Sequence, residues 1–69
     1  MARILDQQTN YTERNNGAWF CGITAIVEYI NDRGKLASQN IMGFGEGQSK
    51  SEALVMAKHD LQEKASRFP

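Results

Sequence analysis

The sequence has 69 residues, with eight basic and eight acidic side chains and a formal net charge of zero. So short a chain buries only about 60% of the surface that it exposes when unfolded. We therefore expect one small domain, residues 1–69, with too little room to assemble a catalytic site, and predict that the protein is not an enzyme. The charge balance also lacks the basic excess that is typical of nucleic-acid-binding proteins.

The hydrophobic content of 41% is enough for an ordered globule. Because Cys21 is the single cysteine, the chain forms no internal disulfide, and we expect a reducing, cytoplasmic environment. The longest mainly apolar run, 18–27, is too short to span a bilayer. These features predict a cytoplasmic protein with no membrane segment.

Three strands and two turns are expected in the first two thirds of the chain. Residues 3–13 form a weakly indicated strand, and Asn and Gly at 15–17 predict a tight turn. Residues 18–30 are rich in aromatic and β-branched side chains and predict the central strand. A turn at 31–34 leads to a third strand over 36–44. The odd positions of the central strand are expected to face the core: Trp19, Cys21, Ile23, Ala25, Val27 and Tyr29.

The register of the second and third strands is predicted from the turn between them. If Ile30 and Lys35 close a four-residue loop, Ile23 faces Met42 on the core side of the sheet, and Cys21 faces Phe44 in the same way. This register gathers the apolar residues on one face, whereas a slip by one residue would place Lys35 and Gln39 beneath the helix.

The last third predicts a helix over 50–67. Ser49 and Glu52 have the spacing of a capping box. Asp60 with Lys64, and Glu63 with Arg67, stand at i,i+4 and favour helix. One helical stripe is expected to pack on the sheet: Ala53, Leu54, Ala57, Leu61, Ala65 and Phe68. The predicted fold is α+β, a three-stranded antiparallel meander with one C-terminal helix on one face (β-β-β-α).

Residues 18–66 resemble the β-β-β-α portion of double-stranded-RNA-binding domains. The residues that carry the likeness are Gly45, Gly47, Ser49, Lys50, Glu52, Ala53, Ala57 and Leu61. The resemblance implies that the helix start contacts RNA phosphates, at positions that fall on Lys50, Ser51 and Leu54, of which only Lys50 is a lysine. The family's first helix has no counterpart in residues 1–16. The layout also resembles antitoxins of the HicB type and small phage or plasmid proteins.

The chemistry-bearing residues do not form a catalytic or metal-binding pattern. The glycines at 43–50 fit neither a Walker loop nor a dinucleotide loop, so a flexible connection is expected there, with an incidental anion site as the alternative. One Cys and one His are too few for a zinc site. Cys21 is interpreted as a core residue and His59 as solvated. We therefore predict no catalytic residue, no cofactor and no metal.

Surplus apolar side chains suggest a function. One helix covers one face of the sheet, which leaves the opposite face uncovered. Candidate interface residues are Phe20, Ile26, Ile30 and Ile41 on that face, with Val55 and His59 on the helix. The sequence thus predicts a non-enzymatic protein-interaction module that binds a protein partner or forms a homodimer. A phage or mobile-element inhibitor of a host protein complex, such as an anti-CRISPR protein, is one example. The alternative is nucleic-acid binding through Arg33, Lys35, Lys50 and Lys58.

Overall fold

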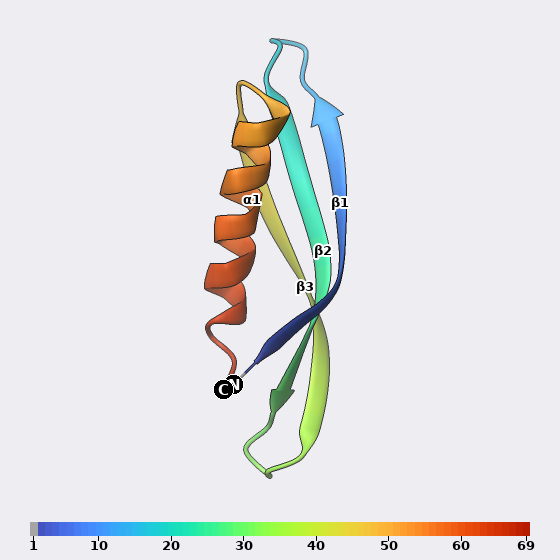
Figure 1. Ribbon diagram of the computed structural model, residues 1–69, viewed down its shortest axis with the longest axis vertical. Helices are drawn as coiled ribbons and strands as arrows, with labels where there is room; N and C mark the ends of the chain where they lie inside the picture. Colours follow the sequence, from blue (N-terminus) through green and yellow to red (C-terminus); the bar gives the residue numbers. More distant parts are fainter. Residues whose placement is uncertain (1) are drawn as a thin grey trace.

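A computed structural model describes residues 2–69 and shows one antiparallel sheet, of strand order β1-β2-β3, with a helix on one of its faces (Figure 1). The elements are β1 (Arg3–Glu13), β2 (Trp19–Ile30), β3 (Leu36–Gly47) and α1 (Lys50–Ala65). The α+β prediction of three strands followed by one helix is confirmed. We call the side of the sheet away from α1 the open face.

The start of α1 follows from its cap. Ser49 is extended and its Oγ accepts a hydrogen bond from the Glu52 backbone N–H at 3.2 Å, which satisfies one of the amides that a helix start leaves unpaired. Both predicted i,i+4 ion pairs form: Asp60 with Lys64 beside β3, and Glu63 with Arg67 on the exposed side of the helix. The helix ends at Ala65, two residues before the predicted end, where the chain enters a turn.

The predicted register of β2 and β3 is wrong by one residue. Ile23 pairs with Gly43, and not with Met42, and the same displacement runs along the whole ladder. Because side chains alternate between the two faces of a strand, a slip of one residue exchanges the faces. Met42 and Phe44 therefore lie on the open face, and Ile41 lies under the helix, where it is buried.

The cause of this displacement is a shorter hairpin loop. Asn31 still belongs to the ladder, because its backbone N–H donates to the Lys35 carbonyl at 2.9 Å, so that the loop has three residues, 32–34. The Asn31 Oδ1 also accepts from the Lys35 backbone N–H. Gly34 closes the loop at φ +76°, the left-handed residue that three-residue hairpin loops require. The four-residue loop expected after Ile30 does not form.

Glycines of β3 allow α1 to approach the sheet closely. Gly43, Gly45 and Gly47 all point toward the helix. A Cβ on Gly43 would lie 2.6 Å from the Ala57 carbonyl oxygen and 2.7 Å from the Leu61 Cβ. Atoms cannot approach so closely, so glycine is required where the helix backbone rests on β3. The flexible connection predicted at 43–50 is for this reason largely ordered strand.

The core lies between this surface and the inner side of β2. Alanines on the helix keep the layer thin, and Ile23, Val27 and Leu61 supply its larger side chains. The predicted core positions of β2 and of the helical stripe all face this layer; eight of them are buried, and four are partly buried against it: Trp19, Tyr29, Leu54 and Phe68, the last of which lies beyond the end of α1. The buried cluster comprises Cys21, Ile23, Ala25, Val27, Ile41, Ala53, Ala57, Leu61 and Ala65.

A bulge interrupts β1. Leu5 pairs with Ile26 and Gln8 with Thr24, so that the β1 segment between the pairs has one residue more than the β2 segment. Asp6, inside the bulge, has φ +53°, a left-handed conformation that Asp tolerates better than most residues. The bulge bends the edge strand in the middle of the sheet.

The molecule is elongated, with extents of 48 × 16 × 14 Å. The helix runs along one end of the sheet, whereas the β2–β3 hairpin continues past the last turn of α1 (Figure 1). In the part of the chain that the structure describes, no helix is long and apolar enough to cross a membrane.

Candidate interaction surface

The open face carries a stripe of apolar side chains along β2 and β3. The register assigns its members, because directly paired residues point to the same side. On β3 the pattern is sharp, since exposed residues alternate with the buried residues that face the helix. We call this set the apolar stripe: Leu5, Phe20, Ile26, Ile30, Leu36, Met42 and Phe44. Leu36 is 66% exposed, Met42 46% and Phe44 42%.

Two aromatic rings pack against each other at the helix-covered end of the stripe. The Phe20 and Phe44 rings stack with centroids 5.7 Å apart and planes inclined by 27°. The Arg14 guanidinium lies 4.8 Å from the Phe20 ring centroid, and its Nε is 3.4 Å from a Glu46 carboxylate oxygen. The aromatic pair is thus an apolar feature beside which Arg14 and Glu46 pair within the chain, and with Gly45 and Glu46 it lines a hollow of about 240 Å³.

A second, larger hollow lies next to the aromatic pair on the open face. The hollow has a volume of about 700 Å³ and lies between the bulge of β1 and the middle of β3. Its walls combine amide and hydroxyl groups with apolar side chains. The open-face residues that line it are Gln8, Thr24, Ile26, Asn40 and Met42, with Asp6 and Gln7 from the bulge.

The rest of the open face is polar. Gln8, Asn10 and Thr12 of β1 point to this side and flank the apolar stripe. At the other end of the face, Arg3 and Glu28 pair at 3.8 Å. An apolar centre with a polar border is the usual composition of a protein–protein interface.

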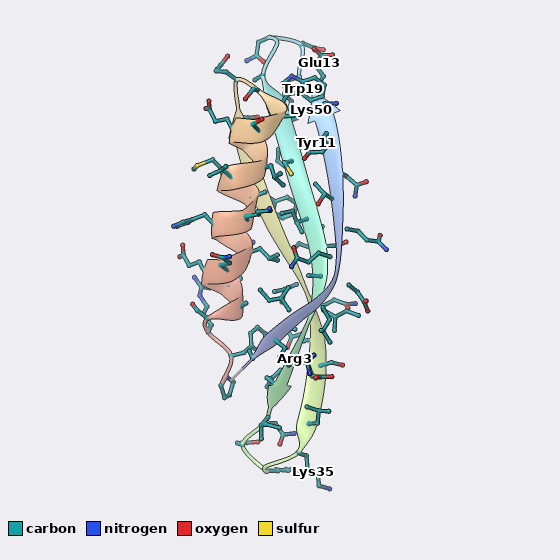
Figure 2. The ribbon with its side chains drawn as sticks, in the orientation of Figure 1. Arg3, Tyr11, Glu13, Trp19, Lys35 and Lys50 are labelled. Atoms are coloured by element: carbon teal, nitrogen blue, oxygen red, sulfur yellow. The ribbon has the colours of Figure 1, made fainter. Side chains whose placement is uncertain are left out.

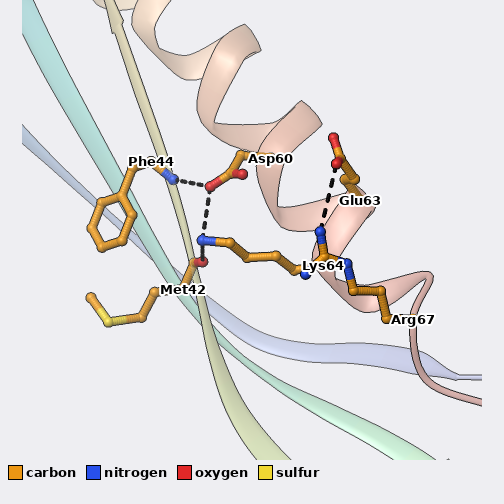
Figure 3. Close-up of polar contacts among 6 residues, drawn as sticks. All are labelled: Met42, Phe44, Asp60, Glu63, Lys64 and Arg67. Carbon is orange, nitrogen blue, oxygen red and sulfur yellow. Dashed lines mark hydrogen bonds and ion pairs between the residues drawn. The ribbon is translucent and has the colours of Figure 1, made fainter.

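Two helix side chains cover part of the outer edge of β3 (Figure 3). The Phe44 backbone N–H donates to the Asp60 carboxylate at 2.9 Å, and the Lys64 ammonium donates to the Met42 carbonyl at 2.8 Å. Asp60 and Lys64 also pair with each other at 3.0 Å. The Phe44 N–H, and after it Lys64, lowers the pKa of the Asp60 carboxyl. Backbone groups that another strand could have bound are occupied here.

The predicted interface residues of the sheet lie mostly where the sequence places them. Phe20, Ile26 and Ile30 are on the open face. The prediction that Ile41 lies on the open face is wrong. Ile41 faces the helix and is 8% exposed, because the shorter hairpin loop shifts β3 by one residue. The same shift places Met42 on the open face.

Sequence reasoning missed three exposed members of the stripe, Leu36, Met42 and Phe44. The signal that could have found them is the alternation of Gly43, Gly45 and Gly47. Three glycines at every second position share one face and mark the side that a helix approaches, so that the residues between them belong to the other side.

Val55 and His59 do not adjoin the open face. Both are exposed on the helix, which lies on the opposite side of the sheet. Val55 is 64% exposed. The structure separates these two candidates from Phe20, Ile26 and Ile30.

The four nucleic-acid candidates do not converge. Arg33 is in the β2–β3 loop and Lys35 directly follows that loop, whereas Lys50 begins the helix, and Figure 2 shows Lys35 and Lys50 at opposite ends of the molecule. The Lys50 ammonium lies 4.8 Å from the Trp19 ring centroid and 5.5 Å from that of Tyr11. Lys58 lies in the middle of α1. No single basic surface brings these charges together among the described residues.

Cys21 is fully buried, and burial raises the pKa of its thiol. Among residues 2–69, no group of three or more His, Cys, Asp or Glu side chains is arranged to hold a metal ion.

Comparison with known proteins finds no relative: no family model, no curated protein and no solved structure matches the chain.

Proposed function

We propose that the protein is a non-enzymatic protein-interaction module that binds its partner through the open face. The observation that carries this proposal is the apolar stripe with its polar border. Leu36, Met42 and Phe44 are large apolar side chains left in solvent on the open face, while α1 lies on the other side of the sheet. Exposed apolar surfaces of this kind usually mark contact sites.

The geometry supports this function over nucleic-acid binding. Phosphate recognition needs several cations along one surface, and Lys35 and Lys50 lie at opposite ends of the chain (Figure 2). The double-stranded-RNA-binding resemblance therefore describes the layout better than the activity. Inhibition of a host protein complex by a phage or mobile-element product remains one setting for such a module.

Site-specific photo-cross-linking tests the proposed surface. A photoreactive phenylalanine analogue at Phe44 is compared with the same analogue at Val55, a position that is also exposed but lies on α1. In the cell that expresses the protein, we expect a discrete protein adduct from Phe44 and none from Val55. Equal yields from both positions, or no adduct from Phe44, would contradict the proposal. The adduct mass identifies the partner as another copy or as a different protein.

A further inference from the structure

We infer that the outer edge of β1 pairs with the same edge of a second copy, so that two three-stranded sheets join into one continuous antiparallel sheet. β1 and β3 are the edge strands of the sheet (Figure 1). An edge strand presents a row of backbone N–H and C=O groups, which matches the backbone of another extended strand. This surface is separate from the open face, and the inference does not depend on the proposed function.

The turn between β1 and β2 shows which residues of β1 direct their backbone groups outward. The Arg14 backbone N–H donates to the Ala18 carbonyl at 2.7 Å, so these two residues form a hydrogen-bonded pair of the ladder. Such pairs alternate with non-hydrogen-bonded pairs in antiparallel strands, and the register continues without a break as far as the bulge. The backbone groups of Thr9, Tyr11 and Glu13 therefore point away from β2.

The same alternation can be checked on β3. Counted from the turn between β2 and β3, it directs the backbone groups of the even-numbered residues of β3 outward. Two of these groups are bound by α1: the Phe44 N–H donates to Asp60, and the Met42 carbonyl accepts from Lys64. The alternation is thus confirmed on β3, and the helix blocks the centre of that edge.

The edge of β1 has a free segment at residues 8–14, between the bulge and the turn at 15–17. Among residues 2–69, no side chain hydrogen bonds to the backbone of Thr9, Tyr11 or Glu13. Proteins commonly protect an exposed edge with proline, lysine or a bulge. The segment contains neither proline nor lysine, and the bulge lies outside it. This part of the edge is therefore available to another strand.

The two ends of the free segment favour a second copy as the added strand. Antiparallel pairing of residues 8–14 with themselves is centred on Tyr11, which faces the second copy's Tyr11 across a twofold axis. Thr9 then faces Glu13, and both direct their backbone groups outward, as a hydrogen-bonded pair requires. Each copy supplies a strand of the same length, so every residue of the segment gains a partner. A longer strand from another protein would meet the irregular backbone of the bulge.

On the open-face side, the charges near this pairing do not oppose it. Arg14 pairs with Glu46 at 3.4 Å within its own chain, and in the dimer it faces Gln8 of the second copy. Asp6 lies just beyond the free segment. Along the joined strands it is nearer to Arg14 of the second copy, a charge of opposite sign, than to Glu13 of that copy. No like charges are therefore directly opposite each other on this side.

On the helix side, each copy contributes one carboxylate and one ammonium group near the axis. Figure 2 shows Tyr11, Glu13 and Lys50 at the same end of the molecule. The Lys50 ammonium lies 5.5 Å from the Tyr11 ring centroid, and Glu13 faces Thr9 of the second copy. Tyr11 is 39% exposed, and its ring meets the same ring of the second copy. Such aromatic pairs stabilise neighbouring strands.

The pairing has a consequence for the open face. Directly paired residues point to the same side of a sheet, so the helices of both copies lie on one side and both open faces lie on the other. Asp60 and Lys64 block the outer edges of the joined sheet, so that growth stops at two copies. The dimer thus presents two open faces side by side.

Analytical ultracentrifugation of the full chain over a wide range of concentrations tests the association. Strand pairing buries a smaller area than an interface of standard size, so we expect a reversible equilibrium between monomer and dimer. Amide hydrogen exchange, measured by NMR on the native protein, locates the contact. Exchange at the Tyr11 N–H should slow as the protein concentration rises. Exchange at the Asn40 N–H, an outward group of β3, is the control and should not change.

The variants Tyr11→Lys and Tyr11→Glu test the register. Each variant alone places like charges opposite each other at the axis, and should associate at least about tenfold more weakly than the native protein. A mixture of the two places opposite charges there and should form a heterodimer. Gln39→Lys and Gln39→Glu change an exposed residue on the helix side of β3. These controls should associate as the native protein does, and circular dichroism checks that all four variants remain folded.

A native protein that stays monomeric at millimolar concentration would overturn the inference, and so would a dimer in which exchange at the Tyr11 N–H does not slow. Native-like association of each Tyr11 variant alone, no heterodimer in their mixture, or assemblies larger than two copies would also contradict it. The Phe44 photo-cross-link reports on the open face. The proposed function can therefore fail while the β1 pairing is confirmed, and the β1 pairing can fail while the proposed function is confirmed.

Discussion

The two faces of the second half of β3 are built from opposite kinds of residue. Toward the helix, β3 presents Gly43, Gly45 and Gly47; away from it, the same strand presents Met42 and Phe44. The helix side gains its stability from the close approach of two backbones, whereas the open face keeps the bulky side chains in solvent. The large apolar residues on the side without a helix are the observation on which the proposed contact with a partner rests.

The largest expected effect separates the two faces of β2. Ile23 is fully buried under the helix, and Ile26 is partly exposed on the open face. Ile23→Ala should lower the free energy of unfolding by about 2–5 kcal/mol, because it leaves a cavity in a thin core. Ile26→Ala should lower it by about 1 kcal/mol or less. Urea unfolding at low protein concentration, where association contributes little, measures both. Equal losses would mean that the two faces are packed alike.

A second comparison uses one substitution on both faces. In Gly45→Ala the new methyl group meets the backbone of Ala57 and Ala53, and the Met56 Cβ at 2.7 Å. In Gly22→Ala the nearest atoms are Phe44 ring carbons at 3.7 Å, an ordinary contact. Gly45→Ala should cost about 1–3 kcal/mol through displacement of the helix, and Gly22→Ala should change the free energy of unfolding little. Thermal unfolding at low concentration distinguishes them, and a stable Gly45→Ala protein would contradict the close approach.

The sequence predicts those elements whose signals are local. The Ser49 cap and the alanine-rich stripe define the helix, and the alternation in β2 defines the strand that faces it. Local patterns do not determine the register of β3, because the register depends on which of the two faces of β3 the helix covers. A register that buried Met42 and Phe44 would cover more apolar area. Only the face with Gly43, Gly45 and Gly47, however, lets the helix backbone approach β3 closely.

The prediction of the candidate site depends on the register of β3 in the same way. Phe20, Ile26 and Ile30 are found from β2 alone, while Ile41 is misplaced and Met42 is missed because both depend on the register of β3. The bulge at Asp6 has no sequence signal, since β1 is polar on both sides and a slip in its pairing changes little apolar burial.

A smaller effect on the free energy of unfolding is expected at the start of α1, the helix that covers one face of the sheet. Ser49→Ala removes the acceptor of the Glu52 N–H and should lower the free energy of unfolding by about 1 kcal/mol. Ser51→Ala, two residues further along the helix, is the matched control and should be neutral or slightly stabilising, because alanine is the better helix former. Chemical denaturation measures the difference, and equal effects of the two variants would argue against the cap.

The smallest effect concerns the edge where the two faces meet. The Phe44 N–H and Lys64 lower the pKa of Asp60 from its ordinary value of 3.8, so the folded state favours the ionised carboxyl. The stabilisation is therefore present above pH 3.8 and is lost as the pH falls through the lower pKa of the folded state.

Carbon-detected NMR titration of Asp60 should find this lowered pKa. The variant Asp60→Asn should flatten the acid limb of the plot of stability against pH, and it should speed hydrogen exchange at the Phe44 amide. Glu63→Gln, at the more exposed ion pair with Arg67, is the control and should leave that amide unchanged. An Asp60 pKa at or above its ordinary value would show that the edge of β3 is open, and strand addition would then compete with contact through the open face.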